Sequence, residues 1–289
     1  MLNRVSVLAL IAVMLVLAYS LAQSAGRQGS SSVEKKETAF ERVMRTRTLR
    51  CGYMFIAPTL MKDNVTGQLS GPSYDLANKI GDLLGLKVEW TEETSFAMEA
   101  EGLKTGRYDM ACILHYMRPN LMTSVEFIQP FFFVPILVVQ RTGETRFRSV
   151  GDSDKDGIRI GGVDGTIPSL IAQDSFKNAK VLSMPEMTPY SENMMVVMTR
   201  KADVTFVDPT IFSSFQAHNP GKLEINKAIP PLRMFAVNFA VGKGEHDLQS
   251  TVDAAVKYLL LNRQVERVLG QYESMRFAVP VAPFYATMD

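Results

Sequence analysis

Apolar and polar positions alternate along the chain in two series of short segments, which are separated by stretches rich in Gly, Pro and Asp. In the first series, short apolar runs typical of strands alternate with segments whose apolar residues recur at helical spacing. In chain order these are strand 48–53, helix 74–84, strand 87–90, helix 97–104 and strand 108–114. Alternation of strands and helices with short connections predicts a parallel sheet covered by helices.

The same order of elements restarts after a polar stretch at 143–157. The second series comprises strand 158–163, helix 167–176, strand 181–184, helix 191–199 and strand 203–207, and a strand at 235–241 and a helical region at 248–271 follow it. Two series of this kind predict two α/β lobes, with the second inserted into the first and two crossover segments between them. A cleft between two such lobes is a usual place for a small ligand.

We expect the folded body to divide into one lobe at 39–140 plus 235–289 and a second lobe at 141–234. Residues 23–38 are polar and lack apolar periodicity, so they predict a flexible linker.

The first 22 residues have the features of a targeting segment. Arg4 precedes an apolar run at 5–18, and the small residues Ser20 and Ala22 form a cleavage-site pattern. The sequence predicts a signal peptide at 1–22; an uncleaved membrane anchor through residues 5–22 is the alternative that the length of the apolar stretch leaves open. Under both readings the rest of the chain is exported, to a periplasmic or other extracytoplasmic location.

Charge and cysteine content narrow the classes of function. Lys and Arg number 31 and Asp and Glu 30, so no basic excess is available to hold a nucleic acid. The two cysteines, Cys51 and Cys112, exclude a cysteine-only zinc site, and the three histidines lack metal-ligand spacing. We expect neither a metal nor another cofactor. A disulfide between Cys51 and Cys112 and a pair of buried thiols both remain open.

Several short motifs occur in a characteristic order. In the first half they are Leu49-Arg50-Cys51-Gly52-Tyr53, Gly67 to Gly71 leading into Tyr74-Asp75-Leu76-Ala77, Leu83 to Trp90, Gly102 to Asp109, and Val125-Glu126-Phe127 before Pro130-Phe131-Phe132. In the second half they are Gly161 to Thr166, Lys201-Ala202-Asp203, Val207-Asp208-Pro209 and Phe239 to Gly244. Over about residues 48–272 the chain resembles the bacterial extracellular solute-binding proteins of family 3, the amino-acid-type receptors of ABC importers.

This resemblance implies an α/β fold of two parallel-rich lobes, the type II periplasmic-binding-protein fold, which closes around its ligand at a hinge. It also implies a small-molecule ligand and a membrane permease of an ABC importer as partners, and we expect the protein to be a monomer.

Gly165 and Thr166 form a turn between a predicted strand and a predicted helix. Unpaired N–H groups at a helix N-terminus attract an anion such as a carboxylate, so both residues are candidate ligand contacts; an ordinary helix start capped by Thr166 is the alternative. Asp208 follows an apolar strand. In the family an acid here commonly accepts hydrogen bonds from a ligand amino group, whereas its position before Pro209 also suits a helix cap.

Aromatic residues at predicted strand ends are candidates for the walls of the cleft. Tyr53 and Phe55 leave the first strand, Phe96 stands where the family often has an aromatic residue, and Tyr116 follows the third strand. Such rings can stack on a planar ligand or cover a cation. His115, beside Tyr116, is a further candidate for a hydrogen bond to the ligand, although a structural role suits it as well.

The sequence departs from the family at Leu121, which stands where the family usually has an Arg that clamps the ligand's α-carboxylate. Arg118, three residues earlier, is a candidate replacement; a solvated surface role is the alternative. Leu121 puts the standard amino-acid ligand in doubt.

The leading hypothesis is a binding protein that delivers a small polar solute, an amino acid or a related compound, to an importer. One rival is an exported enzyme similar to cyclohexadienyl or arogenate dehydratases, with Glu192, Asp208 and His115 as the available acid–base groups. Another is a sensory or partner protein that has lost amino-acid binding.

Overall fold

The computed structural model describes residues 13–16, 18–19, 37–117, 121–185 and 188–281. The chain separates into two compact units, Met1–Thr38 and Ala39–Asp289. The predictions for the targeting segment and linker fall mainly outside the described residues. Within the described part of the chain, no helix has both the length and the apolar character needed to cross a membrane.

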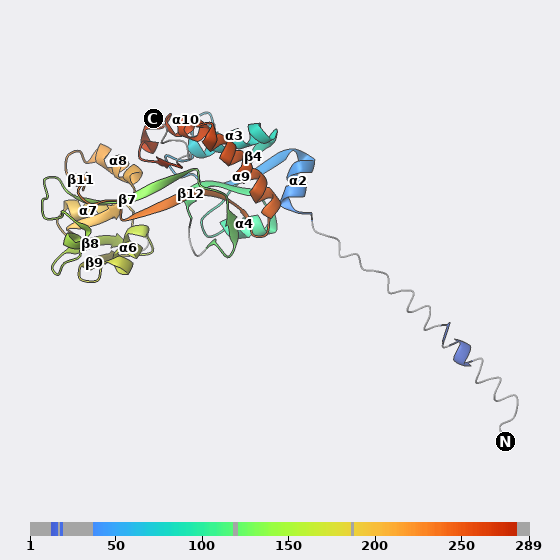
Figure 1. The fold of residues 1–289 in the computed structure, drawn as a ribbon, viewed down its shortest axis with the longest axis horizontal. Helices are drawn as coiled ribbons and strands as arrows, with labels where there is room; N and C mark the ends of the chain where they lie inside the picture. The colour runs from blue at the N-terminus through green and yellow to red at the C-terminus, as the bar shows by residue number, and fades with distance from the viewer. Residues whose placement is uncertain (1–12, 17, 20–36, 118–120, 186–187, 282–289) are drawn as a thin grey trace, which may run out of the picture. The chain divides into compact units, whose positions relative to one another are not determined.

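The second unit contains two α/β lobes, as the sequence predicts (Figure 1). The first lobe has three parallel strands, β4 (Lys87–Glu93), β1 (Thr48–Tyr53) and β5 (Met110–Tyr116), in that spatial order. Its helices include α2 (Ala39–Thr46), α3 (Pro72–Leu84), α4 (Glu99–Thr105), α9 (His246–Leu261) and α10 (Gln264–Leu269). Small elements complete it: β2 (Met61–Lys62), β3 (Leu69–Ser70), β6 (Val125–Phe127), the 3-10 helix η2 (Glu273–Met275) and β13 (Val279–Pro280).

The second lobe repeats this arrangement with three parallel strands, β9 (Lys180–Met184), β8 (Arg159–Val163) and β10 (Val204–Val207). Its helices are α5 (Val150–Ser153), α6 (Ile167–Ser175), α7 (Glu192–Met198) and α8 (Pro209–His218), and β11 (Leu223–Ile225) adds a short strand. In α3, α6 and α8 a proline stands in the first turn, where its missing N–H costs no helical hydrogen bond.

Two long strands connect the lobes: β7 (Phe132–Arg141) and β12 (Arg233–Gly242). They pair with each other in antiparallel register from Phe132 opposite Val237 to Ile136 opposite Arg233. Beyond this pairing, β12 continues along β5 and β6, whereas β7 continues along β10 and β11 (Figure 1). The expected lobe boundaries at 140/141 and 234/235 therefore fall inside these two strands.

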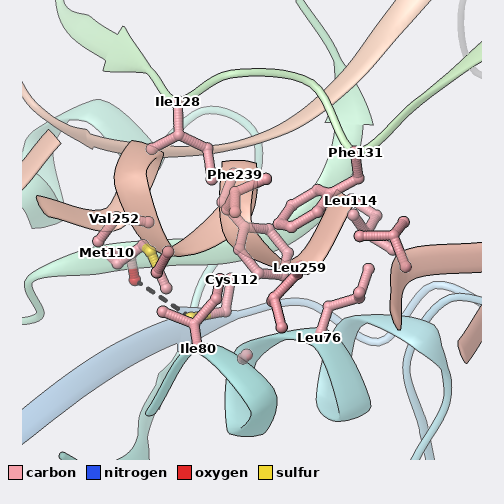
Figure 2. Close-up of a cluster of buried hydrophobic side chains, with 14 of the residues drawn as sticks. Leu76, Ile80, Met110, Cys112, Leu114, Ile128, Phe131, Phe239, Val252 and Leu259 are labelled. Carbon is pink, nitrogen blue, oxygen red and sulfur yellow. Dashed lines mark hydrogen bonds between the residues drawn. The ribbon is translucent and has the colours of Figure 1, made fainter. Parts of the chain in front are cut away.

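Separate hydrophobic cores fill the two lobes. In the first lobe α3 and α9 pack against the sheet through residues such as Leu76, Ile80 and Leu259, and the rings of Phe131 and Phe239 meet edge to face at 4.8 Å (Figure 2). In the second lobe the clusters draw on residues 136–229, among them the fully buried Phe206. Each lobe thus has its own hydrophobic core, which fixes the positions of its strands.

Cys51 of β1 and Cys112 of β5 form a disulfide with Cα atoms 5.4 Å apart. The sequence leaves a disulfide and two thiols open, and the structure has the disulfide. A disulfide of this kind belongs to an oxidising compartment.

A buried aspartate ties the first strand of each lobe to the strand beside it. In the first lobe Asp109 accepts the Arg50 backbone N–H at 2.8 Å and the Arg50 Nη2 at 2.9 Å, and Arg42 of α2 also pairs with it. In the second lobe Asp203 accepts the Arg159 N–H and Nε, both at 3.1 Å. We call these arrangements the Arg–Asp clasps.

Several elements differ from those expected. The run Phe131-Phe132-Phe133, whose sequence suggests core at the approach to the hinge, leads into the crossover strand β7, and α8 extends from the expected cap at Asp208. The predicted helical region at 248–271 is interrupted between α9 and α10, where Arg263 adopts the left-handed conformation with φ of 54°.

Candidate ligand-binding site

The carboxyl ends of β5 and β10 meet where the two lobes face each other. Tyr116, the last residue of β5, donates its phenolic hydrogen to Oδ2 of Asp208, which directly follows β10. Ligands of α/β proteins bind in such a place, outside the carboxyl ends of the strands. The contact therefore marks the candidate site, and it brings together two of the residues that the sequence nominates.

Asp208 has two roles in this position. Its Oδ1 accepts the backbone N–H of Thr210 at 2.6 Å and caps α8, while Oδ2 points to the other lobe. The side chain is nearly buried, with 7% exposed. The helix-cap reading and the site reading of the sequence are compatible here, because a carboxylate has acceptor positions on both oxygens.

Two further aromatic residues lie near the Tyr116–Asp208 pair. Tyr190 precedes α7, and Phe235 of β12 packs against Tyr116 with ring centroids 5.3 Å apart. Burial and the nearby Asp208 charge raise the pKa of Tyr116 and of Tyr190 well above the ordinary value of a phenol. Both hydroxyls consequently stay protonated as donors. We call Tyr116, Tyr190, Asp208 and Phe235 the tyrosine–aspartate cluster.

No pattern in the sequence distinguishes Tyr190 or Phe235 as a site residue. Tyr190 lies in a turn without periodicity, and Phe235 is one apolar position of a long strand. Their place in the cluster depends on neighbours far away in the chain, Asp208 for Tyr190 and Tyr116 for Phe235, which a local pattern does not encode. An aromatic residue just before a predicted helix is the only signal that Tyr190 offered.

Tyr53 and Phe55 lie at the carboxyl end of β1 and are both half-buried. Their rings meet edge to face at 5.4 Å, and Tyr53 also contacts Trp90, which stacks on Tyr74. Burial, and then the charge of Glu93, raises the pKa of Tyr53. The first lobe therefore presents an aromatic wall at this strand end.

Gly165 and Thr166 lie at the amino end of α6, with Gly165 exposed at φ of 74°. The Thr166 hydroxyl donates to the Val163 carbonyl at 2.5 Å and does not cap the helix. Asn193 of α7 holds the same loop, since its Oδ1 accepts the Val163 N–H at 2.8 Å in a fully buried position. The helix terminus is thus fixed in place, and its role toward a ligand stays a prediction.

His115 is buried inside the first lobe. Its Nε2 lies 2.9 Å from Oε1 of the buried Glu99, and its Nδ1 lies 3.1 Å from the Tyr116 carbonyl. The ring of Phe96, a residue that is 43% exposed, lies edge-on to His115 at 6.0 Å. Both ring nitrogens of His115 are thus engaged within the first lobe, and neither of them contacts Asp208.

Leu121, at the family's usual arginine position, packs into an apolar cluster with Leu103, Tyr108 and Val125 and is 8% exposed. Arg118 lies outside the described residues, so its candidate role stays a prediction.

A groove of about 830 Å³ lies between α7 and α8 and is bordered by Ala57, Pro58 and Ser274 of the first lobe. Ser191, Glu192 and Thr210 are among its lining residues. Through Thr210, whose N–H is bonded to Asp208, the groove adjoins the tyrosine–aspartate cluster. Among the described residues, no group of His, Cys, Asp and Glu could hold a metal ion.

Known proteins share this fold and sequence pattern. The chain is 22% identical to the glutamate-binding protein GluB of Corynebacterium efficiens over 230 residues, 76% of each chain. Among solved structures, it superposes on an ancestral cationic amino acid solute-binding protein, AncCDT-1, with a TM-score of 0.64, 21% identity and coverage of 81% of this chain and 99% of that one.

It also superposes on the amino acid ABC transporter substrate-binding protein AbpA of Streptococcus pneumoniae bound to L-arginine, with a TM-score of 0.60, 18% identity and coverage of 82% and 98%. The two-lobed fold predicted from the sequence is thus confirmed. Residues 49–274 match the sequence pattern of one family throughout both lobes. The chain belongs to the bacterial extracellular solute-binding proteins, family 3.

Proposed function

We propose that this protein captures a small polar solute with an amino group, an amino acid or a related compound, in the cleft between its lobes and delivers it to an ABC importer. In this proposal residues 1–22 direct export, the protein acts as a monomer in the periplasm or another extracytoplasmic space, and a membrane permease is its partner. The relatives' printed roles support it, since GluB binds glutamate and AbpA is a substrate-binding protein of an amino acid ABC transporter.

One observation carries the proposal: the hydrogen bond from Tyr116 of one lobe to Asp208 of the other. The donors that the structure gives to this nearly buried carboxylate, the Tyr116 hydroxyl and the Thr210 N–H, are neutral, and a ligand ammonium group would add the opposite charge. A solute that contacts both lobes favours the closed form, because it binds that form more tightly than the open one.

The lobes in this proposal are 39–140 plus 235–289 and 141–234, with movement about β7 and β12. The distribution of the hydrophobic clusters supports this division, because each cluster draws its residues from one side of these boundaries except where the crossover strands contribute.

A thermal-shift screen of the purified protein against amino acids, amines, dicarboxylates, small peptides and sugars tests the proposal. A ligand at 100 times its dissociation constant adds about 2.7 kcal/mol to the free energy of unfolding, which raises the melting temperature by several degrees. We expect Asp208→Asn to abolish the shift. Asp174→Asn, which removes an exposed carboxylate on α6, is the matched control that retains it. No shift from any compound would contradict the proposal.

The enzyme alternative rests on AncCDT-1, which is described as a precursor of cyclohexadienyl dehydratase. Catalysis of that kind needs an acid–base group held against the substrate. Among the described residues no hydrogen bond or ion pair joins His115, Glu192 and Asp208, and His115 is occupied by Glu99. We therefore propose binding without conversion; recovery of an unchanged ligand after prolonged incubation tests it.

A sensory role uses the same closing movement, with a receptor in place of the permease. Measuring ligand uptake after deletion of the gene separates import from sensing, since only import makes uptake depend on the protein.

A further inference from the structure

Besides the crossover strands β7 and β12, the segment that follows α10 touches both lobes. Residues 272–280 include η2 and β13 and continue the chain from α10 of the first lobe. η2 lies against α8 of the second lobe, and β13 then pairs with β7, with Val279 opposite Phe133 (Figure 1). We call residues 272–280 the strap. It leaves the first lobe, touches the second lobe and returns to the hinge.

One side of the strap is anchored in the first lobe. Tyr272, Met275 and Ala278 pack in the hydrophobic core of that lobe, and Met275 is only 6% exposed. These residues are three positions apart, and the N–H groups of Met275 and Ala278 each donate to the carbonyl three residues earlier, at 2.8 Å and 2.9 Å. That spacing places all three side chains on one side of the segment. The Tyr272 hydroxyl also donates to Oδ2 of Asp75 in α3 at 2.7 Å, so the strap belongs to the first lobe.

The residues between these anchors face the second lobe. Ser274 borders the groove between α7 and α8. Arg276 and Phe277 border a cavity of about 580 Å³ together with Phe212 and Gln216 of α8. The strap therefore presents one set of side chains to the first lobe and another set to α8.

The helix that the strap touches is also the helix that begins at the candidate site. Asp208 caps α8, and its Oδ2 accepts the hydroxyl of Tyr116 from the first lobe. The first lobe thus contacts α8 twice, at its amino end through Tyr116 and farther along through the strap. Both contacts are made in the same arrangement of the lobes, the one in which Tyr116 and Asp208 touch.

We propose that the strap is a conformational device: it docks on α8 when the lobes close, and α8 leaves it when they open. Closure then buries apolar surface on residues outside the candidate site, so the strap raises the fraction of molecules that are closed. The apparent dissociation constant of a solute is its intrinsic constant divided by the competent fraction, so the strap also raises the affinity. The inference rests on the hinge movement of the proposed function, but it does not depend on which solute binds.

The distance between two spin labels, one on each lobe, tests the inference without a ligand. Lys104→Cys on α4 and Lys177→Cys just after α6 place the labels at exposed positions. Cys51 and Cys112 are buried and bonded to each other, so they take up no label. Double electron–electron resonance then gives the share of molecules at the label distance of this structure, which are closed, and the share at other distances, which are open.

Two strap variants and one control are compared in this labelled protein. Phe277→Ala removes a half-buried ring beside α8 and should lower the ratio of closed to open molecules about fivefold. Ser274→Lys places a long charged side chain against α8 and should lower the ratio in the same direction. Tyr258→Ala is the matched control, because it removes a ring of α9 that is 50% exposed and lines neither cavity. It should leave the ratio unchanged.

The outcomes separate the inference from the proposed function. An unchanged ratio in Phe277→Ala, or an equal fall in Tyr258→Ala, would show that the strap does not hold α8. If Phe277→Ala does not unfold cooperatively in urea, Ser274→Lys decides in its place. A single distance in every variant would overturn both the strap and the hinge movement. If the ratio falls as expected but no solute binds in the thermal-shift screen, the inference stands and the proposed function fails.

Discussion

The two lobes use the same frame at the amino ends of their strands and different chemistry at the carboxyl ends. Asp109 with Arg50 and Asp203 with Arg159 form equivalent clasps, in which the aspartate accepts both the backbone and the side chain of an arginine on the first strand. The aspartate N–H also returns to the arginine carbonyl in each lobe, at 2.9 Å and 2.8 Å. A repeated frame of this kind indicates a structural role.

At the carboxyl ends of the strands the two lobes carry different residues. The first lobe presents Tyr53, Phe55 and Tyr116, whereas the second presents Asp164, Thr166 and Asp208. One lobe therefore supplies mainly rings and the other mainly acceptors. The amino ends of the strands are built alike in the two lobes, so the residues that differ between the lobes lie at the carboxyl ends. The tyrosine–aspartate cluster lies at these carboxyl ends.

The lobes also differ in how they hold the first strand to its neighbour. Cys51 and Cys112 are bonded covalently, while the equivalent positions in the second lobe are Ile160 and Phe206, both fully buried. The double variant Cys51→Ala/Cys112→Ala should lower the free energy of unfolding by about 4 kcal/mol, because the 61-residue loop gains entropy when unfolded. Urea denaturation followed by circular dichroism measures it; reducing agent on the unmodified protein should give a similar loss. A change below about 1 kcal/mol would show that apolar packing alone holds both lobes.

The clasps should differ in strength because their arginines differ in exposure. Arg50 and Arg42 are 25% and 19% exposed, whereas Arg159 and Arg146 are 43% and 50% exposed. Asp109→Asn should cost about 3 kcal/mol, since it leaves guanidinium groups uncompensated in a partly buried place. Asp203→Asn should cost less, about 1 to 2 kcal/mol, since water screens Arg159 and Arg146 and the less exposed Arg141 lies 3.5 Å away. Urea midpoints of both variants measure this order. A larger loss in Asp203→Asn than in Asp109→Asn would contradict the ranking of the clasps by the exposure of their arginines.

Acid should weaken the second lobe through Glu144 and Asp203, which share Arg146. The hydrogen bond from Arg146 lowers the pKa of Glu144 to about 2, and although burial opposes it, Arg159 and Arg146 keep the pKa of Asp203 below its ordinary value. A lowered pKa in the folded state gives stability that is present above the unfolded pKa, about 4, and is lost as the pH falls through the folded value. Between about pH 4.5 and 2 the free energy of unfolding should fall by about 1 to 2 kcal/mol from Glu144, allowing for screening.

Urea titrations at several pH values check this fall. Glu144→Gln should make the free energy of unfolding depend less steeply on pH over this range. An unchanged slope would show that Glu144 does not contribute to the pH dependence.

The smallest expected effects concern two equivalent turns, one after α4 in the first lobe and one after α7 in the second. Gly106 after α4 and Arg200 after α7 both adopt the left-handed conformation, with φ of 72° and 64°. Gly106→Ala should cost about 1 kcal/mol, because a Cβ is disfavoured there although no atom lies within 4 Å of it. Arg200→Gly should stabilise the protein by about 0.5 kcal/mol or more for the same reason. Melting temperatures measure both, and a loss in Arg200→Gly would show that its side chain contributes more than its backbone costs.

The sequence predicts most of the repeated frame because its strands are short apolar runs, its helices carry apolar residues at helical spacing, and Gly or Pro marks several ends, as at Gly85, Gly106 and Pro209. It does not predict β7 as a strand, since the apolar residues of its first eight positions are continuous, most of them are buried, and they lack alternation with polar residues. The break at Arg263 is missed for another reason: nothing in the local pattern of 248–271 marks a left-handed residue that is not Gly or Asn.

Some residues of the candidate site can also be predicted from the sequence, and others cannot. Asp208 and Tyr116 can be nominated from their places after predicted strands, but their contact joins residues 92 positions apart. Tyr190 and Phe235 enter the cluster through Asp208 and Tyr116, which lie far from them in the chain. The engagement of His115 with Glu99 depends on the packing of α4 against β5, which single-sequence patterns do not report.

A crystal structure of the protein with the compound that binds most tightly tests the central claim most directly. We expect an amino nitrogen of the ligand about 3 Å from a carboxylate oxygen of Asp208, next to Tyr116. A ligand seated instead in the groove between α7 and α8, or one that leaves the Tyr116–Asp208 contact untouched, would contradict it.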